Sequence, residues 1–341
     1  MVDLSETTRI ISALQQPEAY SHPIKSIKKI ITAVSVVFLT GELAYKFNKP
    51  MNLGFLDFST LEKRKDQCEK EIKYNSLISP SLYLGLATIN QDEAGKIQIN
   101  GSGKVIEYAV KMKQMNPDAT INNLLKKNKV TTNHILKLAK TIHDFHQKAS
   151  DDEETKSFGT LESIKFNWEE NFQQTEKYKD FLIPAKTFSN IHHTVNLFLE
   201  KNKNLINQRV VKNKIKHCHG DFHSSNVFIH RGKPIVFDGI VFNKRFPCSD
   251  IIAEIAFMAM DLEYHHQKEL AATFINEYHR LSNDHDIPKL LDFYKCYRAY
   301  IRGKIACFTC DDQNLSAEEK EQTKQTAQEY FKLAKEYAEK L

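Results

Sequence analysis

The sequence lacks several features that would fix its class at once. No apolar run approaches the roughly 18 residues needed for a membrane-spanning helix, and the N-terminus has no signal-peptide pattern. The six cysteines, at positions 68, 218, 248, 296, 307 and 310, are too few and too scattered for a disulfide framework. We therefore expect a cytoplasmic protein with free thiols and without a membrane partner.

A strong charge of one sign is also missing. The net charge is +5, and the lysines are scattered without a block that would bind nucleic acid, so we expect no nucleic-acid partner. Cys307 and Cys310 have the spacing of zinc ligands, but no second Cys or His pair stands nearby, and we expect them to pack within a helix. The 341 residues, 41% of them hydrophobic, suffice for two lobes with separate cores.

The most informative stretch comprises residues 217–240. It predicts a loop followed by a β-hairpin, with strands at Val227–His230 and Pro234–Phe237. β-Branched and aromatic residues form both strands, and Gly and Pro lie in the turn between them. We expect this hairpin to place the polar side chains at its two ends close together.

Three polar residues flank the hairpin: Asp221 and Asn226 precede its first strand, and Asp238 ends its second. Phosphoryl transfer needs a carboxylate that orients the attacking hydroxyl and accepts its proton, and oxygen ligands that hold magnesium against the phosphates. We predict that Asp221 is the catalytic base and that Asn226 and Asp238 bind the metal. The alternative is that these side chains only cap turns.

The motif His-Gly-Asp-Phe-His-Ser-Ser-Asn at residues 219–226, followed by Ile-Val-Phe-Asp at 235–238, resembles the signature of the aminoglycoside phosphotransferase-like branch of the protein-kinase-like fold. The resemblance implies an α+β fold with two lobes, a small antiparallel β-sheet lobe and a larger, mainly helical lobe. We place the nucleotide-binding lobe, with a leading helix, at residues 1–117, and the lobe with the catalytic loop and the acceptor site at residues 118–341. The resemblance also implies ATP and Mg²⁺ as cofactors. His219 would then support the loop, and His223 would contact the acceptor or the phosphate, or only the backbone.

The first predicted hairpin, Ala33–Leu39 and Leu43–Phe47, carries Lys46 in its return strand. Taken alone, this lysine would be an ordinary strand residue. The resemblance implies that it pairs with the α/β-phosphates and is held by a carboxylate from the predicted helix Ser59–Ile78. Glu69 and Glu71 are the candidates, and we choose Glu71 because its Glu-x-x-x-Asn context is similar to related chains. The helix is predicted to begin with Ser59 as N-cap.

Two further strands are predicted at Leu82–Ile89 and Val105–Met112, linked by a polar turn at residues 91–103. The chain then reaches a hinge between the lobes, where Met112 or Met115 would lie on the adenine ring or only pack in the core. No G-x-G-x-x-G loop is present to cover the phosphates, and backbone amides of Thr32–Val36 are candidates for that role. The chain also resembles a subgroup in which this half is fused to a P-loop half; no P-loop motif occurs here, so we expect a stand-alone half.

The remaining chain is predicted to be helical, apart from an acidic polar loop at 150–156. The expected helices are 121–128, 131–149, 161–181, 186–204, 251–262, 267–281, 289–310 and 316–340. The resemblance implies that Asp250 supports the catalytic loop. Lys244 and Arg245 either meet an anionic acceptor or form a solvated loop. Arg298 and Arg302, spaced i and i+4, either hold an anion at the acceptor pocket or form salt bridges.

These patterns favour transfer of the γ-phosphoryl group of ATP to a hydroxyl of a small molecule. Two alternatives remain: a nucleotide-binding regulatory module without turnover, and a kinase-like enzyme that transfers AMP. The sequence leaves the acceptor, ATP against GTP, and the oligomeric state open.

Overall fold

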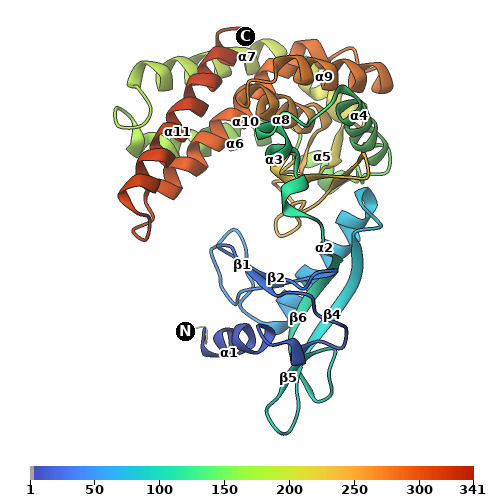
Figure 1. The fold of residues 1–341 in the computed structure, drawn as a ribbon. Helices are drawn as coiled ribbons and strands as arrows, with labels where there is room; N and C mark the ends of the chain where they lie inside the picture. The colour runs from blue at the N-terminus through green and yellow to red at the C-terminus, as the bar shows by residue number, and fades with distance from the viewer. Residues whose placement is uncertain (1–3) are drawn as a thin grey trace. The chain divides into compact units, whose positions relative to one another are not determined.

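A computed structural model describes residues 4–341 of the chain. It forms two compact units (Figure 1). The first comprises the N-terminal segment up to Leu124 together with Asn226–Lys244, and the second comprises Leu125–Ser225 and Arg245–Leu341. The predicted α+β class, with a small antiparallel sheet and a larger helical part, is confirmed. We predicted lobes at residues 1–117 and 118–341; in the structure, Asn226–Lys244 groups with the first unit.

The first unit is built on an antiparallel sheet whose strand order is β1-β2-β3-β6-β4-β5. The strands are β1 (Lys28–Ile31), β2 (Ser35–Leu39), β3 (Leu43–Asn48), β4 (Tyr83–Gln91), β5 (Ile97–Ile99) and β6 (Lys104–Lys113). Alternate residues such as Phe38 and Phe47 point to one face, where they pack with Ile10 and Leu14 of helix α1 (Leu4–Leu14). A short helix, η1 (Pro17–Ala19), follows α1. Strand β5 lies inside the stretch expected to be a turn, because its two isoleucines reach the core.

Helix α2 (Leu61–Ile78) packs against β6 and β4. Its N-cap is Thr60, whose side chain accepts the Lys63 backbone N–H, so the prediction of Ser59 as N-cap was wrong by one residue. Ser59 instead donates its hydroxyl to Asp57 at 2.6 Å. The buried side of α2 is polar, and its residues therefore need partners in the sheet.

The predicted second hairpin is present in the first unit as β8 (Val227–His230) and β9 (Lys233–Val236). Arg231 and Gly232 make the turn with φ of 50° and 71°. Ile235 and Phe237 pack against a cluster of Cys68, Leu82, Tyr83 and Val110. The short elements η2 (Pro117–Ala119) and α3 (Ile121–Lys126) lie at the end of the N-terminal segment, and Thr120 bridges to Phe228.

The second unit is mainly helical (Figure 1). Its helices are α4 (Thr132–His146), α5 (Glu153–Ser157), α6 (Leu161–Thr175), η3 (Glu176–Tyr178), α7 (Ala185–Val211), α8 (Ile251–Tyr264), α9 (Lys268–Ser282), α10 (Ile287–Cys310) and α11 (Ala317–Ala338). Residues 251–262 of α8 are all buried, so this helix forms the centre around which α9 and α10 pack. Helix α5 replaces the predicted loop, because Asp152 caps it by accepting the Thr155 N–H.

Candidate active site

Lys46 lies between two carboxylates of the first unit. Its Nζ is 3.0 Å from Glu71 Oε1 on α2 and 2.6 Å from Asp238 Oδ1, just after β9. Burial opposes the charge on Lys46, but Asp238 and Glu71 outweigh it and raise the pKa of this ammonium well above its ordinary value. The contact expected between Lys46 and Glu71 is therefore present, with a charged lysine.

The backbone around Asp238 is fixed by two polar side chains. Asp238 has a φ of 64°, in the left-handed region, and its N–H donates to the Tyr83 hydroxyl at 3.1 Å. The next N–H, of Gly239, donates to Asn75 Oδ1 at 2.8 Å. Asn75 stands one helical turn after Glu71, so α2 holds both Lys46 and the segment after β9.

Asn226 and Asp238 flank the two strands of the hairpin. Val227 pairs with Val236, and the Phe237 N–H donates to the Asn226 carbonyl at 3.0 Å. Both residues therefore belong to the open end of the hairpin, opposite its turn. An amide oxygen and a carboxylate are the hard ligands that magnesium prefers, so this end of the hairpin suits the predicted metal.

The predicted catalytic loop begins in the second unit, after strand β7 (Ile215–His217), which pairs with β10 (Cys248–Asp250). Gly220 has a φ of 84°, and a Cβ placed on it would lie 3.0 Å from Pro247 Cα. Only glycine fits both the left-handed conformation and this close approach without strain. The Gly of the motif is thus required by the path of the loop.

A buried carboxylate from α8 holds this loop by its backbone. Glu254 accepts the N–H of His219 at 3.0 Å and that of Gly220 at 2.8 Å. It also accepts Nε2–H of His146 at 2.9 Å, while His146 Nδ1 accepts from the Tyr278 hydroxyl at 2.7 Å. Burial opposes the charge on Glu254, but the hydrogen bonds with His146 and the loop outweigh it and lower the pKa of this carboxyl.

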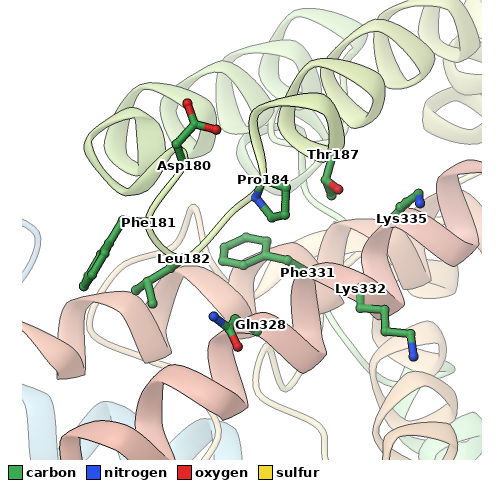
Figure 2. Close-up of a pocket in the computed structure, with 9 residues that line it drawn as sticks. All are labelled: Asp180, Phe181, Leu182, Pro184, Thr187, Gln328, Phe331, Lys332 and Lys335. Carbon is green, nitrogen blue, oxygen red and sulfur yellow. The ribbon is translucent and has the colours of Figure 1, made fainter.

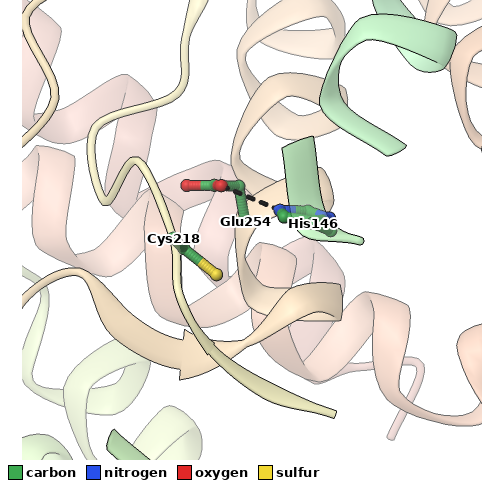
Figure 3. Close-up of side chains that lie close together, drawn as sticks. All are labelled: His146, Cys218 and Glu254. Atoms are coloured by element: carbon green, nitrogen blue, oxygen red, sulfur yellow. Dashed lines mark hydrogen bonds and ion pairs between the residues drawn. The ribbon is translucent and has the colours of Figure 1, made fainter. Parts of the chain in front are cut away.

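His146, Cys218 and Glu254 have the chemistry of metal ligands, and their ligand atoms lie within 4.8 Å of one another (Figure 3). The hydrogen bonds of Glu254 and His146 already occupy the atoms that a metal would need. Burial raises the pKa of the Cys218 thiol well above its ordinary value, and its Sγ–H donates to the Ser249 carbonyl. We interpret the group as a support of the catalytic loop rather than as a metal centre.

Asp221 stands next to His223 within the loop. His223 Nδ1 accepts the Ser225 N–H at 3.3 Å, so a ring proton is on Nε2, which lies 3.4 Å from Asp221 Oδ2. Burial opposes ionisation of Asp221, but His223, His219 and Arg302 outweigh it and hold its pKa below its ordinary value. Asp221 is therefore an ionised carboxylate at neutral pH.

Two further groups of the second unit fix the loop. Arg298 on α10 donates to the Gly220 carbonyl and to the Ala253 carbonyl, both at 3.1 Å. Asp261 on α8 accepts the Ser224 N–H at 2.9 Å. Arg298 is therefore a buried support of the loop, and the hypothesis that it pairs with Arg302 to hold an acceptor is not supported.

Asp250, predicted to support the catalytic loop, has another role. It caps α8 by accepting the Ile252 N–H and forms two bonds of 2.7 Å with the buried guanidinium of Arg209. Arg209 also binds Asp284 at 2.7 and 2.8 Å. The support of the loop comes from Glu254 and Asp261, one and three turns further along α8.

The remaining predicted site residues are buried or partly buried. Met112 and Met115 are partly buried and pack on the cluster that contains Tyr83 and Val110, as does Phe237 beside Asp238. His219 is buried, and its ring contacts that of Phe222. Glu254 and Asp261 were not predicted, although acids in the otherwise apolar segment 251–262 were a signal that buried partners exist.

A cavity away from this chemistry lies between residues 180–184 and α11, lined by Phe331 and Lys332 among others (Figure 2). It contains none of the predicted site residues. Among residues 4–341, none of the helices combines the length and apolar character that a bilayer crossing needs.

Comparison with solved structures finds small-molecule kinases over nearly the whole chain. A choline kinase from Cryptosporidium parvum aligns with 98% of this chain and 97% of its own, at 12% identity and a TM-score of 0.56. A choline/ethanolamine kinase family protein from Mesorhizobium loti aligns with 98% and 99%, at 8% identity and a TM-score of 0.54. The chain has the protein-kinase-like fold. An amicoumacin kinase in complex with AMP-PNP and Ca²⁺ also matches, at 14% identity over 97% of this chain and 93% of its own, with a TM-score of 0.52.

The comparison with sequence relatives does not indicate an activity. A comparison with models of protein families found no match. Uncharacterised proteins of Mycobacterium bovis and Mycobacterium tuberculosis are each 28% identical over 276 residues, which is 81% of this chain and 54% of the relative. The chain thus spans about half the length of the curated relatives it matches.

Proposed function

We propose that the chain is an ATP- and Mg²⁺-dependent phosphotransferase that moves the γ-phosphoryl group of ATP to a hydroxyl of a small molecule. The observation that supports it most is the chain of ion pairs from Glu71 through Lys46 to Asp238. A partly buried, charged lysine beside a solvent-accessible acid, whose side chain is 51% exposed, suits phosphate and metal binding. The fold of the solved kinases supports the same reaction class.

In this proposal Lys46, oriented by Glu71, binds the α/β-phosphates of the nucleotide. Asn226 and Asp238 hold Mg²⁺, which supplies charge neutralisation at the phosphates when bound. Asp238 would therefore serve two groups: it contacts Lys46 in the structure, and it would be a ligand of the metal. Met112 and Met115 line the adenine subsite.

Asp221 accepts a hydrogen bond from the acceptor hydroxyl and takes its proton as the phosphoryl group is transferred. Its lowered pKa keeps it ionised and able to orient the hydroxyl at neutral pH. His223, with a proton on Nε2, holds the carboxylate in place, and Glu254 and Arg298 bind the backbone N–H and the carbonyl of Gly220, directly before Asp221. The base and the nucleotide-binding residues must act on the same phosphoryl group. In the motif, four residues separate Asp221 from Asn226.

The test is ADP release from ATP and Mg²⁺ with a panel of hydroxyl compounds that includes choline, ethanolamine, amicoumacin and sugars. We expect release with at least one acceptor, and loss of release in Asp221→Ala. AMP attached to a target would instead favour the AMP transferase. ATP consumption that Asp221→Asn leaves unchanged would favour the regulatory module.

A further inference from the structure

Two cations of the second unit bind side chains of helix α6. Glu170 pairs with Arg245, whose Nη1 lies 3.3 Å from Glu170 Oε1. Lys304 on α10 donates to Asn171 Oδ1 at 2.6 Å and to Gln174 Oε1 at 2.8 Å. Arg245 and Lys304 therefore contact consecutive residues of α6, and the two cations are close enough for the charge of Arg245 to lower the pKa of the Lys304 ammonium.

Lys304 is a half-buried cation whose hydrogen-bond partners carry no charge. Among residues 4–341 no carboxylate oxygen lies within ion-pair distance of its Nζ, and its two acceptors are neutral amides. Burial and the nearby charge of Arg245 lower the pKa of this ammonium to about 8, although Glu170 opposes them. A cation near a second cation and without an acidic partner is electrostatically unfavourable. A bound anion would reduce that cost.

Aromatic rings lie around the Arg245 guanidinium. The Arg245 guanidinium lies 5.2 Å from the ring centre of Phe166, which is 57% exposed, and 5.4 Å from that of Phe246. Tyr297 packs edge-on against Trp168 at 5.1 Å, and its neighbour Arg298 binds the Gly220 carbonyl beside Asp221. Tyr297 and Arg298 are adjacent on α10, so the contact of α10 with α6 and its contact with the predicted catalytic loop come from neighbouring residues.

We propose that Lys304 and Arg245 form the anion-binding part of the acceptor site, and that the acceptor is a hydroxyl compound carrying a carboxylate or phosphate group. This inference rests on the proposed function and narrows its substrate class. Lys304 offers a third N–H donor, and Arg245 offers a guanidinium that aromatic rings orient, so the two provide charge-assisted hydrogen bonds to one anion. The reacting hydroxyl of the same compound is then the group that Asp221 deprotonates.

The experiment compares compounds that share one hydroxyl skeleton: glycerol, glycerate and glycerol 1-phosphate, with choline as a cationic acceptor. ADP release is measured for the wild type, Lys304→Met and Lys289→Met. Lys289 is an exposed lysine of the same helix, so its variant is a control for the change in charge. We expect one of the two anionic compounds to be preferred, and Lys304→Met to raise its KM by roughly 10- to 100-fold with little change in kcat. The anion that is used distinguishes a carboxylate from a phosphate acceptor.

Equal use of glycerol or choline, or an unchanged KM in Lys304→Met, would overturn the inference while leaving the phosphotransferase proposal intact. If no compound releases ADP, binding of glycerate and glycerol 1-phosphate is measured by calorimetry. Binding that is lost in Lys304→Met and kept in Lys46→Met supports the anion site without the proposed reaction. Binding that Lys304→Met leaves unchanged, or no binding to the wild type, contradicts it.

Discussion

The Glu254 carboxylate accepts the backbone N–H of Gly220 at 2.8 Å, one residue before the candidate base Asp221. Arg298 approaches the same glycine from its carbonyl side at 3.1 Å. The two peptide units that directly precede Asp221 are thus held by two buried charges of opposite sign. Since Gly220 itself has a left-handed conformation, these contacts decide the direction in which the following side chain leaves the loop.

Glu254→Gln is expected to lower both stability and activity. An amide has one oxygen, so one backbone N–H of the loop would face the amide NH₂ and lose its acceptor, at a cost of about 1–3 kcal/mol. We expect the free energy of unfolding, from urea titration, to fall by that amount and kcat for ADP release to fall at least tenfold. The control is Glu269→Gln on the exposed face of α9. A variant with wild-type kcat would show that the loop does not depend on this carboxylate.

Lys46→Met is expected to abolish productive nucleotide binding. The substitution removes the cation shared by Glu71 and Asp238 and leaves two neighbouring carboxylates that repel phosphate. We expect kcat/KM for ATP to fall by at least a hundredfold, about 2.7 kcal/mol of transition-state stabilisation. Lys49→Met, which changes a nearby lysine bonded to carbonyls of Thr32 and Ala33, is the comparison. Equal losses in both variants would argue against a special role for Lys46.

The pH dependence of activity should report on Asp221. Its pKa lies below the ordinary value, so activity that needs the ionised base is retained down to acidic pH and lost only as pH falls through this lowered pKa. His223→Asn removes one cause of the lowering, and the acidic limb of kcat/KM should then move to higher pH. An acidic limb that does not move would mean that His223 does not set the ionisation of the base.

Arg209→Met tests the buried ion cluster that supports β10 and the start of α8. Its guanidinium binds Asp250 and Asp284, and its removal leaves two buried carboxylates without this partner. We expect a loss of about 3–5 kcal/mol in the free energy of unfolding, measured with denaturant. Adding Asp250→Asn and Asp284→Asn to Arg209→Met should recover part of that loss, since the triple variant also lacks the buried acids. No recovery would mean that packing of the Arg209 side chain, rather than its charge, is responsible.

Much of the site could be predicted because its signals are local. A turn with left-handed residues flanked by β-branched strands specifies the hairpin, and the positions of Asn226 and Asp238 beside its paired strands place both residues at its open end. The choice of Glu71 over Glu69 also agrees with the structure, because residues 71 and 75 share the buried side of α2.

The partners of the catalytic loop could not be predicted in the same way. Asp250 is a good N-cap by sequence, but Glu254 reaches the loop only because α8 is buried at the centre of the helices and turns that side chain toward residues 35 positions earlier. The amino-acid sequence by itself determined the hairpin, the motif and the helices, since these depend on neighbours within a few residues. Only the tertiary structure decided that Glu254 and Asp261 support the loop and that Lys304 binds amides rather than an acid, because both depend on packing between distant segments.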